Sequence, residues 1–285
     1  MNRSRLVLAL ASLSIACGGG ASETRATETT PAPPSSADTS SEPAPDATAA
    51  APASPPPRVR VVHATSDEAA GTVSVALDSG EPFVSSLAYG AASGYVAVDE
   101  GRHSIVVHGG SDDAPSTLAV ASDVLEADHA YTVFFVTQGA ADAPFALYTG
   151  DDDDQPGDEV AGVRFFNAII GGDDVDVCLP GASARATGEP VFADVAPNAL
   201  GSASGPRYAD LPAGDEVALQ VRAHGSPPCR GRAIGVARFT PEAGASYTAV
   251  AIGRTTGRPR APLQLLVCRD APGDGSCTAV PLGSR

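Results

Sequence analysis

The sequence contains no lysine and no tryptophan, and aromatic residues make up only 5% of its 285 positions. All 18 basic residues are therefore arginines. Without a lysine amine, the chain cannot form a Schiff base, a Ser–Lys dyad or the phosphate-binding loop of a P-loop enzyme. The formal net charge of −16 also argues against nucleic acid as a partner, because phosphates require a basic surface.

Long apolar runs are scarce as well, and the clearest one lies near the N-terminus. Arg3 and Arg5 precede a short apolar segment at residues 6–15. This segment is too short to span a bilayer as a mature helix. A positive start followed by a short apolar core is typical of a secretory signal, so we interpret residues 1–16 as a signal peptide.

The signal ends in Ser14-Ile15-Ala16-Cys17, followed by Gly18, and resembles the lipobox of bacterial lipoproteins. In that family the cysteine is diacylated and becomes the mature N-terminus, so the resemblance implies that Cys17 anchors the protein to a membrane. Gly18, where an aspartate would signal retention, favours the outer membrane, with the protein facing the periplasm or the surface. Ser14 replaces the usual leucine, and Ser14 with Ala16 also suits ordinary signal peptidase, so a soluble secreted protein is the alternative.

Residues 17–57 form the next compositional segment. After Cys17 it contains nine prolines and no aromatic residue, valine, leucine, isoleucine or methionine. Such a segment cannot bury enough apolar surface to offset the entropy lost on ordering. We therefore expect a disordered tether between the anchor and the folded part.

From Arg58 onward, short runs rich in β-branched residues alternate with turns rich in Gly, Pro and Asp. Residues 72–77 alternate between apolar and polar side chains, which is the pattern of a half-buried strand. No amphipathic helix is evident after the signal. This texture predicts an all-β protein of antiparallel, immunoglobulin-like β-sandwiches. The strands expected in the first half are residues 58–64, 72–77, 94–98, 103–108, 116–124, 131–137 and 145–149.

The second half of the chain repeats motifs of the first half in the same order, which indicates a tandem duplication. The matched segments are residues 59–64 with 163–168, 94–101 with 207–214, and 130–133 with 246–249. We expect a first sandwich at residues 58–150, an acidic linker at 151–160 and a second sandwich at 161–285.

These motifs resemble the domain of unknown function 4397 family. The first copy carries Val-Arg-Val-Val-His-Ala at residues 59–64, Tyr-Gly-Ala-Ala-Ser-Gly-Tyr at 89–95 and Ala-Tyr-Thr-Val at 130–133. In the second copy Asn167 replaces the histidine. The family's domains are tandem β-sandwiches on exported bacterial proteins, and the family has no established activity. The resemblance therefore implies fold and location and does not imply a mechanism.

Four cysteines remain besides Cys17, and an even number in an exported protein predicts disulfides. Three pairings are open. We favour Cys268 with Cys277, because residues 269–276 read as a turn that brings its two ends together, which leaves Cys178 with Cys229. The close spacing of a zinc site is absent.

No catalytic constellation is evident in the sequence. His63, Ser66 and Asp67 include the residue types of a hydrolase triad, but they are sequence neighbours, and triads assemble from distant segments. We interpret them as a strand end and a turn, and retain His63 and Asp67 as candidate binding residues. Tyr89 and Tyr95 are the best aromatic candidates for binding, although core packing explains both.

The acidic clusters at residues 112–113, 151–154 and 173–176 are the remaining candidates for a site. Calcium takes oxygen ligands, but none of these clusters fits an EF-hand loop. We interpret them as solvated acids of turns and expect no metal and no cofactor.

These observations favour a cell-envelope lipoprotein that acts as a non-catalytic binding or structural module. Its partners would be the membrane, through the lipid anchor, and an envelope protein or a polysaccharide. A hydrolase with an unrecognised site and a calcium-dependent adhesin are the alternatives.

Overall fold

The structure is a computed structural model that describes residues 54–67, 70–111, 114–138, 145–152, 155–180, 188–201, 208–256 and 260–283. Residues 52–285 cluster into one compact unit. The expected signal peptide, Cys17 and nearly all of the expected tether lie outside the described residues. Within the described ranges, no helix is long and apolar enough to cross a membrane.

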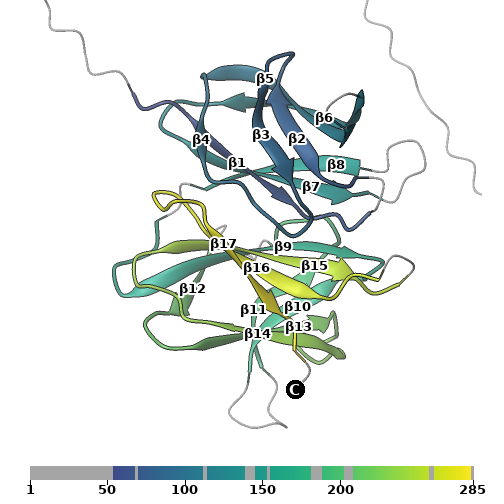
Figure 1. The fold of residues 1–285 in the computed structure, drawn as a ribbon. Coiled ribbons are helices and arrows are strands. Elements are labelled where there is room, and N and C mark those ends of the chain that lie inside the picture. Colours follow the sequence, from purple (N-terminus) through teal and green to yellow (C-terminus); the bar gives the residue numbers. More distant parts are fainter. Residues whose placement is uncertain are drawn as a thin grey trace, which may run out of the picture. The chain divides into compact units, whose positions relative to one another are not determined.

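The first half of this unit is a β-sandwich of two four-stranded sheets, which we call sandwich 1 (Figure 1). One sheet has the order β4-β1-β7-β8 and the other β3-β2-β5-β6. The strands are β1 (Arg58–His63), β2 (Val73–Leu77), β3 (Pro82–Leu87), β4 (Val96–Ala97), β5 (Gly101–Ser111), β6 (Ala114–Leu125), β7 (Ala130–Thr137) and β8 (Phe145–Asp151).

The second half, sandwich 2, has a corresponding strand order and one further strand at its C-terminus. Its sheets have the orders β12-β9-β15-β16-β17 and β11-β10-β13-β14. The strands are β9 (Val160–Ile170), β10 (Val175–Leu179), β11 (Glu189–Val195), β12 (Ala209–Pro212), β13 (Val217–Ala223), β14 (Ala233–Phe239), β15 (Ser246–Arg254), β16 (Gln264–Arg269) and β17 (Cys277–Pro281).

The prediction of an all-β protein with two β-sandwiches is confirmed. Each sandwich also contains one parallel pair within its otherwise antiparallel sheets: β1 with β7 and β9 with β15. The registers of the two pairs correspond, because Arg60 lies beside Thr132 in one and Arg164 beside Thr248 in the other. The three matched sequence segments therefore occupy corresponding places in the two sandwiches.

Strand β3 was missing from the expected strands of the first half. It begins at Pro82, which cannot donate a backbone hydrogen bond, and it pairs with β2 through two register shifts. Ser86 adopts a positive φ of 54° within it. These irregularities remove the alternating pattern by which a strand is recognised in a sequence.

The strands β1, β7, β9 and β15 are buried on both faces. In β1, Val59 and Val61 belong to the core of sandwich 1, whereas Val62 belongs to a separate apolar cluster between the sandwiches. Phe134 and Phe166 stack at the centre of this second cluster, with ring centroids 4.2 Å apart. Its buried members are Val62, Ala64, Phe134, Val136, Phe166, Ala168, Val250, Ile252, Leu266 and Cys268.

The inner sheets of the two sandwiches therefore pack against each other, and this packing explains the sequence of their central strands. A strand covered on both faces reads as a nearly continuous apolar run and does not alternate. The unit thus consists of four stacked sheets, and the inner sheet of each sandwich faces the inner sheet of the other (Figure 1).

Both disulfides are present as expected. Cys178 pairs with Cys229, and Cys268 pairs with Cys277. Both bridges lie in sandwich 2.

Candidate functional site

The most concentrated group of charged side chains lies between the two sandwiches. Arg60 projects from β1 and Arg164 from β9, each on the strand face turned away from its own core. Their residues are 0% and 1% exposed. An arginine cannot lose its charge in a protein, so burial requires partners that compensate the charge and satisfy the N–H groups.

Arg60 finds most of these partners in sandwich 2. Its Nη2 forms an ion pair with Oδ1 of Asp270 and donates to Thr248 Oγ1 at 3.2 Å. Its Nη1 donates to the backbone oxygen of Arg269 at 2.9 Å. Within sandwich 1, Nε donates to Thr132 Oγ1 at 2.7 Å. The guanidinium is therefore fully engaged.

Arg164 makes the reciprocal set of contacts. Its Nη2 forms an ion pair with Asp152 Oδ1, and its Nη1 donates to the Asp151 backbone oxygen at 2.6 Å. Both acceptors belong to sandwich 1 and its continuation. Within sandwich 2, Nε donates to Thr248 Oγ1 at 2.8 Å. Each sandwich thus inserts one arginine toward the aspartate of the other, as in an isologous dimer interface.

A threonine and a tyrosine complete each half. Thr132 donates to Asp152 Oδ2 at 2.6 Å, and Tyr95 donates to the same oxygen at 2.5 Å. In sandwich 2, Thr248 and Tyr208 donate to Asp270 Oδ2 at 2.8 and 2.6 Å. We call these eight side chains the Arg–Asp network: Arg60, Thr132, Asp152, Tyr95, Arg164, Thr248, Asp270 and Tyr208.

The tyrosines of the network remain protonated donors. Burial raises the pKa of Tyr95 to about 12, and burial also raises the pKa of Tyr208. The guanidinium of Arg60 lies 4.9 Å from the centre of the Tyr95 ring, and that of Arg164 lies 5.3 Å from the Tyr208 ring. The rings therefore cover the arginines with a cation–π contact in addition to their hydrogen bonds.

Asp152 corrects the interpretation of residues 151–154 as solvated acids. It is 0% exposed and accepts bonds from Arg164, Thr132 and Tyr95. The carboxylate can be buried because a buried arginine compensates its charge. Asp176, in the 173–176 cluster, is also 0% exposed, but its partners are His224 and the backbone nitrogens of Asp194, Gly225 and Cys229.

The Arg–Asp network connects the two sandwiches through side chains that bind one another. Its two arginines and two aspartates are neutral as a set. Arg60 pairs closely with Asp270 and Arg164 with Asp152, and the two cross pairs are longer, at 3.8 and 4.0 Å. A buried ion pair of this kind contributes little net stability relative to apolar packing, but removal of one partner leaves a costly unpaired charge. The network therefore favours one relative arrangement of the sandwiches over slipped ones.

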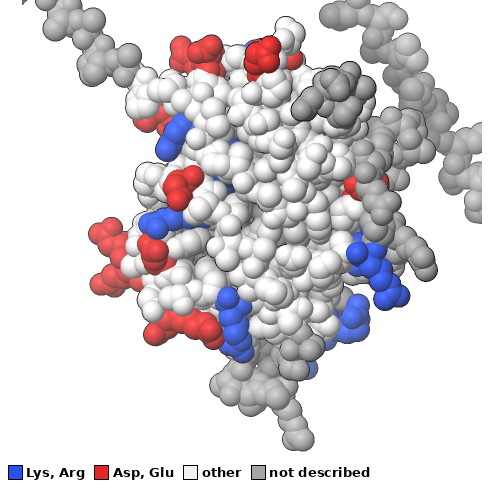
Figure 2. All heavy atoms as spheres, in the orientation of Figure 1, with Lys and Arg blue, Asp and Glu red and all other residues white. Residues whose placement is uncertain are grey.

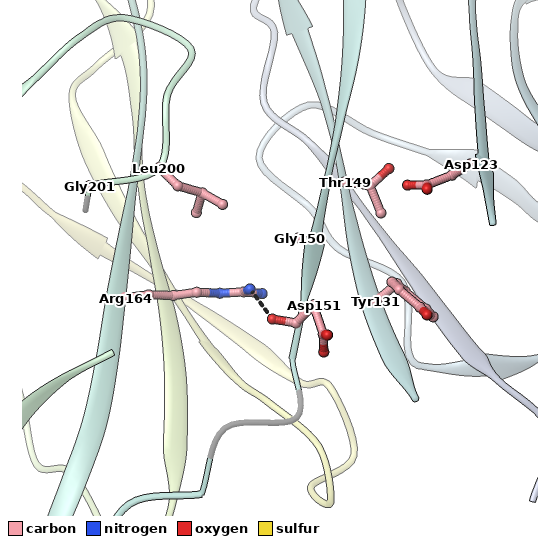
Figure 3. Close-up of a pocket in the computed structure, with 8 residues that line it drawn as sticks. All are labelled: Asp123, Tyr131, Thr149, Gly150, Asp151, Arg164, Leu200 and Gly201. Carbon is pink, nitrogen blue, oxygen red and sulfur yellow. Dashed lines mark hydrogen bonds between the residues drawn. The ribbon is translucent and has the colours of Figure 1, made fainter. Parts of the chain in front are cut away.

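A cavity of about 410 Å³ adjoins the network (Figure 3). In Figure 3, Arg164 extends from β9 toward the backbone of Asp151, while Leu200 points toward β8. Gly150 allows this approach, because a Cβ there would lie 2.9 Å from Arg164 Nη1. The lining residues are Asp123, Tyr131, Thr149, Gly150, Asp151, Arg164, Leu200 and Gly201.

The polar side chains that line this cavity mainly accept hydrogen bonds. Asp123 and Asp151 contribute carboxylates and Thr149 contributes a hydroxyl, beside the ring of Tyr131. Arg164 also lines the cavity, and three of its five N–H groups already donate to protein oxygens. A volume of this size lies in the range of small-molecule sites.

Of the four sequence-predicted binding residues, the structure brings His63 and Tyr89 together and places Tyr95 apart from them. The rings of His63 and Tyr89 lie 6.3 Å apart, edge to face. His63 is 0% exposed, and its Nε2 lies 3.0 Å from the oxygen of Gly71. Burial lowers the pKa of His63. Tyr95 lies instead in the Arg–Asp network.

The segment after His63 is a turn. The nitrogen of Asp67 donates to Thr65 Oγ1 at 3.2 Å, and the nitrogen of Ala70 donates to the oxygen of Asp67. No described hydrogen bond joins His63 to Ser66 or Asp67. Among the described residues, no group of three histidine, cysteine or acidic side chains could hold a metal ion.

Tyr131 and Tyr247, which occupy corresponding positions in the matched segments 130–133 and 246–249, each form a tyrosine corner. The hydroxyl of Tyr131 accepts from the nitrogen of Glu126 at 3.0 Å, and that of Tyr247 accepts from Glu242 at 3.1 Å. Both pairs have the spacing Glu-x4-Tyr. Such a corner fixes the chain where it enters a strand.

The comparisons with known proteins identify one domain family. The described unit is a two-sandwich, all-β protein with a charged and buried interface. Residues 57–178 match the model of DUF4397, a domain of unknown function, which supports assignment of this region to that domain family. The match covers all of sandwich 1 and continues through β9 into β10. No significant match was found among the curated proteins.

Proposed function

We propose that this protein is a cell-envelope lipoprotein whose two sandwiches form one non-catalytic binding and structural unit. The observation that carries the proposal is the reciprocal burial of Arg60 and Arg164. The two buried guanidinium groups hold the two sandwiches in a fixed arrangement, and they are not available to a substrate. Sandwich 2 would be a second copy of the domain that matches sandwich 1, since both carry the same four network residues.

The N-terminal segment and the disulfides support this location. Cys17 would carry the lipid, and residues 18–57 would be the tether between the outer membrane and the sandwiches. Two or more acyl chains suffice for stable attachment. Two disulfides are compatible with an oxidising compartment and unusual in a reducing one.

The cavity beside the Arg–Asp network is the binding site that we assign to this unit. Its carboxylates and its threonine hydroxyl suit a ligand that donates hydrogen bonds and bears no negative charge. An amino sugar of an envelope polysaccharide has this chemistry. A protein partner would instead use the outer surfaces: on the face drawn in Figure 2, charged side chains lie mainly along the margins and the centre is uncharged.

Membrane fractionation of cells that express the full chain tests the anchor. The wild-type protein should remain in the outer-membrane fraction after a high-salt wash, because lipid rather than charge holds it there. Cys17→Ala should move it to the soluble fraction. Retention of this variant in the membrane would contradict lipidation at Cys17.

Titration of the purified protein with glucosamine, followed by NMR, tests the cavity. We expect shifts of the amides of Thr149 and Gly150, and binding about tenfold weaker in Asp123→Asn, because one charged hydrogen bond is lost. Asp210→Asn, at an exposed position of β12, is the matched control and should bind as the wild type does. Equal weakening in both variants would indicate nonspecific attraction by the acidic surface.

A further inference from the structure

The hairpin between β16 and β17 carries the Cys268–Cys277 disulfide at its base. The two cysteines lie directly opposite each other in the register of the two strands. Residues 269–276 form the turn between them. Cys268 is 0% exposed and belongs to the apolar cluster between the sandwiches, and Cys277 packs against the same cluster.

This hairpin supplies most of the acceptors that Arg60 uses in sandwich 2. They are the carboxylate of Asp270, the backbone oxygen of Arg269 and, at 3.5 Å, the backbone oxygen of Gly275. Only Thr248 comes from elsewhere in sandwich 2. The position of the hairpin therefore determines whether the Arg60 half of the network can form.

The hairpin also touches sandwich 1 at two further points. Gly275, with a φ of +78°, lies so close to Tyr95 that a Cβ there would be 2.8 Å from the ring. Gln155, in the connection between the sandwiches, donates to the oxygen of Ala271 at 3.2 Å. The turn is thus a contact surface between the sandwiches, and its ends are fixed by the disulfide.

The other half of the network has no comparable constraint. Asp152 follows β8 directly and accepts from Arg164 without any cysteine nearby in the sequence. The Cys178–Cys229 bridge joins β10, in the outer sheet of sandwich 2, to residue 229. One bridge therefore acts on the interface and the other does not.

We propose that the Cys268–Cys277 disulfide is a redox-sensitive clamp on the interface between the sandwiches. Its reduction frees residues 269–276 to leave their bound conformation, which releases the Arg60 half of the network and leaves the Arg164 half in place. The loop then regains conformational freedom that the bridge removes. The inference rests on the contacts of the hairpin and depends neither on the lipid anchor nor on a ligand.

The reductant is a dithiol of the thioredoxin type. Its thiolate attacks the sulfur of Cys277, which is only half-buried, and the S–S bond breaks with Cys268 leaving as a thiolate that takes up a proton. The second thiol of the reductant then displaces Cys277 from the mixed disulfide. The protein gains two thiols and the reductant becomes a disulfide, so atoms and electrons balance.

Treatment of the folded, full-length wild-type protein with a small dithiol, followed by alkylation and mass spectrometry, tests the accessibility of the clamp. Cys268 and Cys277 should be alkylated first, because Cys277 is only half-buried, whereas Cys178 and Cys229 are 0% and 3% exposed. Earlier reduction of Cys178–Cys229, or reduction of both bridges only on global unfolding, would overturn the proposal.

Hydrogen exchange tests whether reduction of the Cys268–Cys277 disulfide loosens the interface between the sandwiches. In protein reduced at the clamp, and in Cys268→Ala/Cys277→Ala, the amides of residues 94–98, beneath the hairpin, should exchange at least about tenfold faster. Those of β13 should not change. Cys178→Ala/Cys229→Ala is the matched control and should show the reverse pattern. Unchanged exchange at residues 94–98 in the clamp-reduced wild type would refute the clamp, whether or not the double variant folds.

Discussion

The two sandwiches share a strand order and the four network residues, but they differ in how their outer parts are secured. Sandwich 2 contains both disulfides and a fifth strand in its inner sheet, whereas sandwich 1 has neither. In the inner sheets, the order β4-β1-β7-β8 corresponds to β12-β9-β15-β16, and β17 is additional. The central strands β1 and β7 thus have direct counterparts in β9 and β15, and the two sandwiches differ in the added edge strand and in the disulfides.

The outer sheets show the difference most clearly. In β10, Asp176 and Cys178 point away from the core and are nonetheless 0% exposed, because the segment that carries His224 and Cys229 lies over them. In β6 of sandwich 1, Val120 and Val124 are 58% and 40% exposed. The outer face of sandwich 2 is thus covered at β10, whereas the outer face of sandwich 1 is open at its edge strand β6.

The largest predicted effect concerns the network that the sandwiches share. Arg164→Met leaves the buried Asp152 with only its longer ion pair to Arg60, at 3.8 Å. Arg60→Met likewise leaves Asp270 with only its 4.0 Å ion pair to Arg164. Each should reduce the free energy of unfolding by about 3–5 kcal/mol, measured by urea denaturation. The two losses should be similar if the halves carry equal weight.

The double variant Arg164→Met/Asp152→Asn separates charge from packing. It should recover a large part of the loss, because no unpaired charge remains in the interface. If the double variant is less stable than Arg164→Met, the network acts through its geometry rather than through charge compensation.

The second-largest loss of stability should come from removing the Cys178–Cys229 disulfide, which has no counterpart in sandwich 1. Removal of the Cys178–Cys229 bridge in Cys178→Ala/Cys229→Ala should cost about 2–4 kcal/mol, because a long loop is released in the unfolded chain. Hydrogen exchange should rise in β10 and β13 and stay unchanged in β2 and β5. Equal loosening of both outer sheets would mean that the interface transmits the change.

Removing the hydrogen bond of either tyrosine corner should cost less stability, and the loss should be equal in both sandwiches. Tyr131→Phe and Tyr247→Phe each remove the acceptor of one backbone nitrogen, that of Glu126 and that of Glu242. Each should cost about 1 kcal/mol in thermal or urea unfolding. Tyr148→Phe is the control, and a comparable loss there would show that ring chemistry rather than the corner hydrogen bond is responsible.

Much of the fold could be predicted from the sequence because its main signals are local. Apolar runs marked β1, β7 and the matching strands of sandwich 2, and the turn at residues 269–276 indicated the Cys268–Cys277 pair. Strand β3 gave no such signal, since a proline and a backbone irregularity interrupt it. Local patterns fail where the chain departs from regular geometry.

The Arg–Asp network was harder to foresee, because periodicity assigns only one face of a strand to a core. Arg60 and Arg164 stood at equal places in matched segments, and so did Tyr95 and Tyr208, which was the available signal. Asp152 lay in an acidic run and carried no pattern that set it apart from its neighbours. Its burial is decided by an arginine from the other sandwich, which is a contact between distant parts of the chain.

The last prediction uses pH to distinguish the sandwiches at one corresponding position, where sandwich 1 has His63 and sandwich 2 has Asn167. Burial lowers the pKa of His63 below its ordinary value of 6.5, so the unfolded chain binds the proton more readily. Stability should therefore be lost as the pH falls below about 6.5. His63→Asn should flatten this slope in urea midpoints measured from pH 5 to 8, even if its overall stability is lower.

His224 of sandwich 2 has a pKa shift of the opposite sign and therefore serves as the control. Its hydrogen bond to Asp176 raises the pKa of the imidazole, so its contribution is present below pH 6.5 and is lost as the pH rises through the folded value. His224→Asn should remove stability at low pH and leave the acid loss due to His63 in place. If His63→Asn leaves the slope below pH 6.5 unchanged, the buried histidine is not what makes sandwich 1 sensitive to acid.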